Sequence, residues 1–321
     1  MGERVLYTKA FPIMGGGGVI EFIDERGPEA AESIARRAID EADRIERKYS
    51  RYLPDSVVSR IIRDAGRTPV AVDSETTGLV RTALDLAERT AGAFDPTSGV
   101  LRRVWNFRER RVPDRADVEA ILPLVDYRQV SLRDGTVFLR RAGMEIDLGG
   151  VGKEYAADRV AEILLAERAV PALVNLGGDV RTLGARGDGH PWRIGVQDPR
   201  DRDRCRFSVR LMGDAGVATS GDYERFFVID GVRYHHLLDA RTGMPARGVA
   251  SVTVVGPTAF KAGLAATTAF LLGAEAGLAS LEASPGIEGA VITEAGAVET
   301  TTGMWKLSDL PGSIFADYPG I

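Results

Sequence analysis

Hydrophobic residues recur along the chain with two different periods, which predict strands and helices in turn. Residues 7–22 alternate between apolar and polar positions around a run of glycines, so they predict two strands joined by a turn at 14–18. From Pro28 the apolar positions recur every three or four residues, which predicts a helix with one face packed on a sheet. The same period predicts helices near 57–61, which Asp55 or Ser56 can cap, at 73–91 and at 260–273.

Short strands joined by tight turns occupy much of the remaining chain. Asp134-Gly135 and Asp230-Gly231 are dipeptides typical of type I′ hairpins, and each lies between two apolar runs. Residues 108–125 are charged and predict an irregular or short-helical surface segment. Further strands are predicted at 171–176, 192–199, 206–212 and 250–256, with a last hairpin at 290–301. The pattern predicts an α/β protein with mixed, largely antiparallel sheets and packed helices.

Composition narrows the classes of protein that the chain can belong to. The 321 residues are 44% hydrophobic and 27% charged, which suffices for a full core, and no linker divides them. We therefore expect one domain over residues 5–315, or two intimately packed lobes. The net charge of −5 argues against nucleic-acid binding, which usually needs a basic surface. A single cysteine and three histidines exclude a disulfide framework and argue against a zinc centre.

The sequence offers no segment that targets the chain to a membrane. The first residues carry charges at Glu3, Arg4 and Lys9, with no apolar run of signal-peptide length and no lipobox cysteine. No segment approaches the roughly 20 apolar residues of a membrane span. We expect a cytoplasmic protein that binds no membrane.

The candidate chemistry centres on residues 146–159, IDLGGVGKEYAADR. Here Asp147 ends an apolar run, a glycine-rich turn follows, and Lys153 begins a helical pattern, so we expect a strand, a tight turn and a helix N-terminus. Such a helix start favours an anion, and a phosphate-bearing ligand is the natural candidate. A Walker A loop is excluded because Glu154 follows the lysine, and a dinucleotide fingerprint is excluded because Tyr155 replaces its third glycine. An ordinary strand-to-helix turn is the alternative.

Three other features accompany this stretch. A second strand ends in Asn175, two glycines and Asp179, which suggests two backbone walls that face one ligand. Asp95 lies in a loop after Phe94, where its carboxylate either serves a site or bonds to its own backbone. His236 lies on a predicted strand, and a lone histidine there is more often packed or solvated than catalytic.

Taken in order, the motifs resemble the FAD:protein FMN transferase family (ApbE-like). The similarity extends from Phe11 to about Gly303 and comprises Met14-Gly15, YxPDSxxSR, AFDPTSG, DLGGVGKEYAADR, NLGGD, TSGDYER, HxxDARTGxP and an apolar helix ending in LLG. It implies an ApbE-like, T-fold-related fold and transfer of the FMN part of FAD to a Ser or Thr hydroxyl of an acceptor protein, with release of AMP. It also implies that His236 is the base and that FAD is contacted by Met14, Tyr52, Ala93, Phe94, Asp95, Asp147, Lys153 and Leu238.

The chain departs from this family at the metal site. The family's last apolar helix carries an aspartate ligand four residues before a threonine ligand, and here Thr267 is present but Gly263 occupies the aspartate position. No other acid lies between residues 260 and 274, and Gly150 remains as a backbone-carbonyl ligand. A second departure is Gly16, where the family's N-terminal motif has threonine.

Three hypotheses follow from these departures. The first is an FMN transferase that recruits Mg²⁺ through the FAD pyrophosphate, helped by Asp147, Asp179 or Asp239. The second is a flavin-binding protein that has lost transfer and serves as a carrier, sensor or partner subunit, and the third is an FAD pyrophosphatase. On the first hypothesis, Gly263→Asp should raise Mg²⁺-dependent AMP release.

Overall fold

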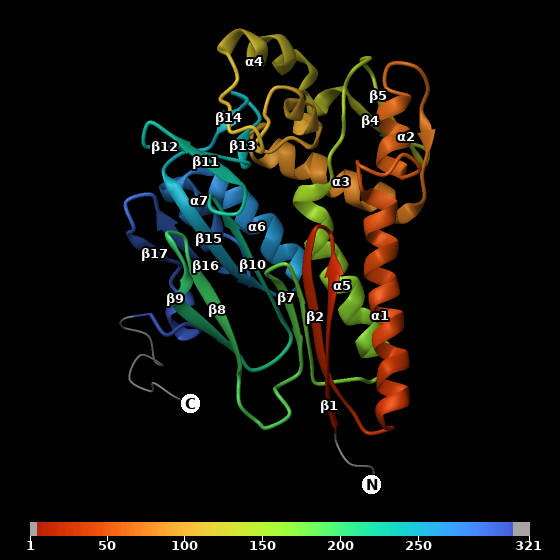
Figure 1. Ribbon diagram of the computed structural model, residues 1–321, viewed down its shortest axis with the longest axis vertical. Helices are drawn as coiled ribbons and strands as arrows, with labels where there is room; N and C mark the ends of the chain where they lie inside the picture. Colours follow the sequence, from red (N-terminus) through yellow and green to blue (C-terminus); the bar gives the residue numbers. More distant parts are fainter. Residues whose placement is uncertain (1–4, 311–321) are drawn as a thin grey trace.

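The computed structural model describes residues 5–310, which fold around one eight-stranded sheet (Figure 1). The strands lie in the order β1-β2-β6-β7-β10-β15-β16-β17, and every neighbouring pair is antiparallel. This confirms the predicted α/β architecture of largely antiparallel sheets with packed helices. The strands are β1 (Val5–Ile13), β2 (Gly16–Asp24), β6 (Ala172–Leu176), β7 (Asp179–Leu183), β10 (Ala215–Gly221), β15 (Val249–Gly256), β16 (Glu288–Thr293) and β17 (Val298–Thr300).

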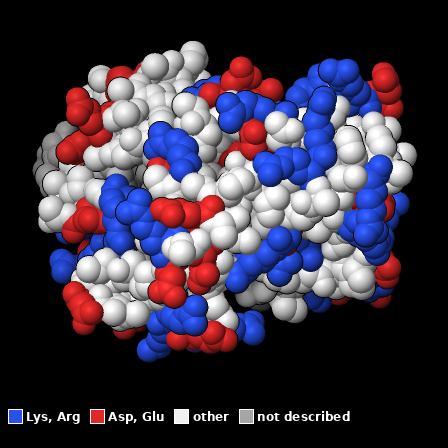
Figure 2. Space-filling model, turned by 90° about the horizontal axis from the view of Figure 1, so that it is seen from above, with Lys and Arg blue, Asp and Glu red and all other residues white. Residues whose placement is uncertain are grey.

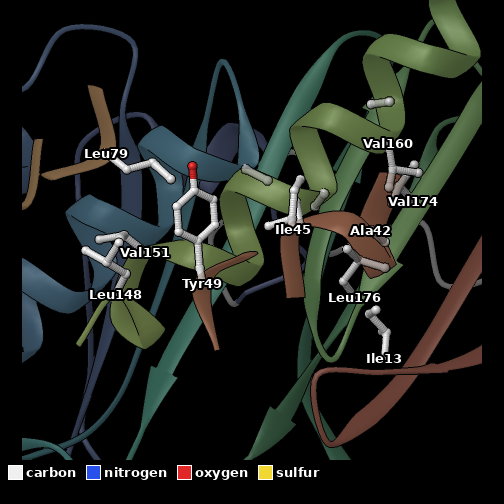
Figure 3. Packing of buried hydrophobic residues seen from close by; sticks show 14 of the residues in the cluster. Ile13, Ala42, Ile45, Tyr49, Leu79, Leu148, Val151, Val160, Val174 and Leu176 are labelled. Carbon is white, nitrogen blue, oxygen red and sulfur yellow. The ribbon is translucent and has the colours of Figure 1, made fainter. Parts of the chain in front are cut away.

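Four helices cover one face of this sheet. Helix α5 (Gly149–Ala166) packs on β6 and β7 and beside α1 (Pro28–Tyr49), while α6 (Ala259–Leu272) packs on β10 and β15 and α7 (Ala274–Glu282) on β16. Apolar side chains fill the space between them, and Figure 3 shows the part of this core built from Ala42, Ile45, Tyr49, Val151, Val160, Val174 and Leu176.

A two-stranded ribbon covers the other face. Strands β8 (Trp192–Asp198) and β9 (Asp201–Leu211) bring Trp192 and Phe207 against the apolar residues of β10, β15 and β16. Strand β15 is therefore covered on both sides, and all eight of its residues are buried. Its two polar side chains, Ser251 and Thr253, are small and are buried together with the apolar ones.

A smaller layer lies beyond the upper ends of α1 and α5 (Figure 1). Its three-stranded sheet contributes Val70, Val137 and Leu139 to the same cluster of buried residues as Ile34 and Ile45 of α1. The division into one domain over residues 5–315, or two intimately packed lobes, stays a prediction, and its end at 315 lies outside the described residues. The layer contains α2 (Val57–Arg63), β3 (Val70–Ala71), α3 (Ser74–Arg89), β4 (Val130–Arg133) and β5 (Thr136–Leu139).

The remaining elements are short. Helix α4 (Arg115–Ile121) falls in the segment expected to be irregular or short-helical, and 3₁₀ turns occupy Pro96–Arg103, Leu122–Leu124, Tyr127–Gln129 and Met304–Lys306. The predicted hairpins are confirmed as β4–β5 and as β11 (Phe226–Ile229) with β12 (Val232–His235), and both residues of each turn have positive φ, as type I′ turns require. Strands β13 (Leu238–Asp239) and β14 (Met244–Pro245) form a further pair.

Two predictions near the site were wrong, and one helix was missed. The first turn consists of Met14 and Gly15 alone, because the next three glycines already pair within β2. Residues 144–148 form no strand, since the Asp147 amide instead donates to the Pro96 carbonyl at 2.7 Å. The helix α7 was missed, because Gly273, with a φ of 88°, interrupts the apolar pattern where one helix ends and the next begins.

Charged side chains are mixed over the surface. On the face in Figure 2, Lys and Arg lie interspersed with Asp and Glu, and no uniform basic surface forms there. Within residues 5–310, no helix is long and apolar enough to cross a membrane. The cytoplasmic location stays a prediction.

Candidate active site

The N-terminus of α5 is held in place by Asp147. Its Oδ1 accepts the Gly149 amide at 2.8 Å, and its Oδ2 forms an ion pair with the Arg51 guanidinium at 2.7 Å. The predicted turn glycines therefore belong to the first turns of the helix, and none of them adopts a left-handed conformation. Arg51 also lies 5.3 Å from the ring of Tyr52, which is 73% exposed and is therefore free to stack on a planar ligand.

The second glycine turn lies beside this helix start. Gly177 and Gly178 both have positive φ, and the Gly178 amide donates to the Asn175 side chain at 2.8 Å. Lys153 reaches across from α5 to Asp179, with 3.4 Å between Nζ and Oδ2. The structure thus brings together the two glycine segments that the sequence placed 25 to 30 residues apart.

The β1–β2 hairpin adds Met14 to the same end of the sheet. The Gly177 amide donates to the Gly17 carbonyl at 2.9 Å, so the tip of the hairpin lies against the second glycine turn. The amide of Met14 donates to Glu46 of α1 at 2.9 Å, which fixes the hairpin tip on the helix layer.

The loop that contains Asp95 is built by its carboxylate. Oδ1 accepts the amide and the hydroxyl of Thr97 at 2.7 and 2.6 Å, and Oδ2 accepts the Tyr127 amide at 2.8 Å. With three donors bound and 4% exposure, this carboxylate shapes the loop. It thereby positions Phe94, whose Cε2 lies 3.3 Å from the point where a Cβ on Gly150 would be.

A third segment is tied to this loop. The Ala93 carbonyl accepts the Ala240 amide at 3.0 Å, which joins the loop to the turn after Leu238. Leu238 itself packs against the cluster around Trp105 and Phe227.

His236 lies at the end of β12 rather than within a long strand. The expectation that His236 lies on a strand was wrong, because β12 ends at His235 and the His236 amide donates to the Arg225 carbonyl at 3.0 Å. Among the described residues, the buried Nδ1 of His236 has no hydrogen-bond partner. Burial and the positive charge of Arg225 lower the pKa of His236 to about 4, below the ordinary value of a histidine.

Sequence reasoning missed one acid of this region. Glu154 is 8% exposed, and a Cβ built on Gly263 would lie 2.4 Å from its Cγ and 2.8 Å from its Oε1. Burial and the nearby Asp179 carboxylate raise the pKa of Glu154 to about 8, although Lys153 opposes this effect. Burial likewise raises the pKa of Asp179 to about 6. The sequence shows a glutamate directly after Lys153, but no local pattern indicates that this glutamate lies beside Gly263.

The hydroxyl of Thr267 lies one helical turn beyond Gly263. Its Oγ1 is 3.2 Å from Ser220 Oγ, while the neighbouring Thr268 donates back to the Leu264 carbonyl at 2.7 Å, as threonines in apolar helices often do. Among the described residues, no group of three or more His, Cys, Asp or Glu side chains is placed to hold a metal ion. Any cation site here would therefore need hydroxyl and backbone oxygens as well.

The chain is an α/β protein with a site suited to a phosphate-bearing ligand. The site combines two glycine-lined segments, a helix N-terminus, a lysine and a neutral histidine. Comparison with known proteins agrees, since the model of the ApbE family matches residues 14–291. The chain belongs to the ApbE family.

Individual relatives cover most of the chain. An FAD:protein FMN transferase of Treponema pallidum (strain Nichols) is 39% identical over 73% of this chain and 70% of its own length. One from Klebsiella pneumoniae (strain 342) is 35% identical over 82% of this chain and 83% of its own length. Among solved structures, the ApbE protein of Thermotoga maritima superposes with a TM-score of 0.84 at 37% identity, covering 93% of this chain and 97% of that one.

Proposed function

We propose that this chain is an FAD:protein FMN transferase, which moves the FMN part of FAD to a Ser or Thr hydroxyl of an acceptor protein and releases AMP. The observation that carries the proposal is the meeting of Lys153, the second glycine turn and the start of α5 at one end of the sheet. Family membership supports the same activity, since the relatives described above carry this name.

Several residues would bind the pyrophosphate and the planar rings of FAD. The Lys153 ammonium and the backbone of the glycine segments would contact the pyrophosphate, where positive charge is needed. Tyr52 and Phe94 offer aromatic surfaces for the planar rings, and Met14 and Leu238 offer apolar contacts. Ala93, Asp95 and Asp147 would act mainly by fixing the loops, because both carboxylates already have partners.

His236 would serve as the base. Its pKa of about 4 keeps the imidazole neutral at physiological pH, so that it can accept the proton of the attacking hydroxyl. The hydroxyl oxygen would then form a bond to the FMN phosphorus while the bond from that phosphorus to the AMP oxygen breaks. A bound pyrophosphate would raise the pKa of the imidazole again, since a nearby anion favours its protonated form.

The donors that the resemblance assigns to Mg²⁺ are all oxygens, which suits this cation, but the Gly150 carbonyl and the Thr267 hydroxyl are neutral. When bound, the cation would neutralise charge on the pyrophosphate.

The test is to incubate the purified protein with FAD, Mg²⁺ and a bacterial protein extract freed of small molecules. We expect AMP and covalently bound flavin on an acceptor, measured by chromatography and in-gel fluorescence. The variant His236→Gln should bind FAD with similar affinity but release AMP about 10²- to 10⁴-fold more slowly. FAD that stays intact with and without EDTA would support a carrier instead, and AMP with free FMN would indicate FAD hydrolysis.

A further inference from the structure

The side chain of Glu154 occupies the space that a larger residue at position 263 would fill. A Cβ on Gly263 would lie within 2.4 to 2.9 Å of the Cγ, Oε1 and Cδ atoms of Glu154, closer than real contacts allow. A carboxylate thus lies where the family's aspartate would begin, although it comes from a different helix.

The packing of α5 against α6 fixes this placement. Asp158 accepts the amides of Ala259 and Phe260 at 2.9 and 3.0 Å, which anchors the start of α6 on α5. The helices run antiparallel, so moving back one turn along α5 and forward one turn along α6 brings Glu154 opposite Gly263. One further turn along the same register leads to Gly150 on α5 and Thr267 on α6, the two remaining ligand positions.

Glu154 also differs from the other acids that were considered. Asp147 is paired with Arg51 at 2.7 Å, Asp239 with Arg241 at 2.6 Å and Asp179 with Lys153 at 3.4 Å. No cationic side chain forms an ion pair with Glu154 within residues 5–310, and its buried Oε2 has no hydrogen-bond partner there. A buried carboxylate oxygen without a donor is stabilised when a cation binds to it.

We propose that Glu154 supplies the carboxylate ligand of a divalent-cation site completed by the Thr267 hydroxyl and the Gly150 carbonyl, in place of the aspartate that α6 lacks at Gly263. The inference rests on the proposed function, because that function provides the need for a cation at this point. On this proposal, Glu154 of α5 supplies the negative charge of the site, and Gly263 of α6 leaves the space that the glutamate side chain occupies.

The experiment measures Mn²⁺ binding directly, by the electron paramagnetic resonance signal of free Mn²⁺ during titration of the full chain, with and without FAD. We expect Glu154→Gln, which preserves the shape of the side chain, to weaken Mn²⁺ binding about 10- to 100-fold. The double variant Glu154→Gly/Gly263→Asp returns the acid to α6 and should restore most of the affinity. Circular dichroism and thermal unfolding verify that each variant is folded.

The matched control is Glu162→Gln, two turns further along α5, where the carboxylate is 58% exposed and pairs with Arg159. This variant should bind Mn²⁺ as the unmodified protein does. Equal Mn²⁺ affinity of Glu154→Gln and the unmodified protein, or no Mn²⁺ binding by the unmodified protein even with FAD, would overturn the inference. AMP release is measured separately, so a chain that binds Mn²⁺ through Glu154 without releasing AMP would refute only the proposed function.

Discussion

Replacing Gly263 by alanine tests how closely Glu154 packs on α6, without reference to activity. Within a helix, Gly→Ala normally stabilises by about 1 kcal/mol, because glycine loses more backbone freedom on folding. Here the new methyl group would lie 2.4 Å from Glu154 Cγ, which is not the flexible end of that side chain. Overpacking of this kind costs about 1 to 3 kcal/mol. We therefore expect Gly263→Ala to leave stability unchanged or to lower it by up to about 2 kcal/mol.

The same substitution should have the opposite sign once Glu154 is shortened. In a Glu154→Ala background the clash is gone, so Gly263→Ala should stabilise by up to about 1 kcal/mol. The coupling free energy between the two positions is then about 1 to 3 kcal/mol. Gly78 in α3 is the control, because no atom lies within 4 Å of its built Cβ, and Gly78→Ala should stabilise equally in both backgrounds.

Urea unfolding of the unmodified chain, the two single variants and the double variant gives this coupling directly. Equal effects of Gly263→Ala in both backgrounds would refute the reasoning, since the two side chains would then not compete for one space. The outcome also bears on Gly263→Asp. Alone, that variant would place a second carboxylate against Glu154, so the gain in AMP release expected from the sequence should appear only when Glu154 is removed as well.

Two further predictions concern the scaffold of the site. Asp95→Asn should lower the free energy of unfolding, measured in urea titrations, by about 1 to 3 kcal/mol. The new side-chain amide cannot accept hydrogen bonds from all three donors, and its NH2 group would face the Tyr127 amide. An unchanged unfolding midpoint would mean that the loop does not depend on this carboxylate. Glu75→Gln should destabilise by a similar amount at pH 7, since Arg44 and Tyr155 donate to Glu75 and the Arg44 hydrogen bond holds its pKa below the usual range. Because the pKa of Glu75 is lower in the folded than in the unfolded chain, where it is about 4.3, this side chain stabilises the fold above about pH 4.3, and the stabilisation is lost as pH falls toward the folded pKa. The difference in Tm between Glu75→Gln and the unmodified chain should therefore shrink below about pH 4 and not at pH 6.

Local sequence signals predicted most of the fold. The apolar face of α1, the cap at Ser56 and the two Asp-Gly hairpins each depend on residues that are neighbours in sequence, and each was confirmed. The errors arose where tertiary contacts decide. Residues 144–148 look like a strand, but the Asp147 amide bonds to the loop at Pro96, about 50 residues earlier in the chain.

The candidate site divides in the same way. Asp147, Lys153 and Asp179 could be selected from glycine-rich motifs, because turn chemistry is encoded locally. The pKa of His236 could not be predicted from the sequence, since it depends on burial and on Arg225, which β11 and β12 bring near it.

The acid beside Gly263 is the reason why we do not equate the missing aspartate with a lost site. One helix face was expected to supply both side-chain ligands, and residues 260–274 contain no acid, so Asp147, Asp179 and Asp239 were the acids suggested from elsewhere in the chain. The structure places an acid of a second helix beside this position, since Asp158 accepts the Ala259 amide at the start of α6 and Glu154 lies one turn away from that contact. A glycine on one helix and a buried acid on the other are each unfavourable alone, since glycine weakens a helix and an unpartnered carboxylate resists burial. Glu154 fills the space that a side chain at position 263 would need, so the glycine on α6 and the buried acid on α5 are better treated as one arrangement than as two separate features.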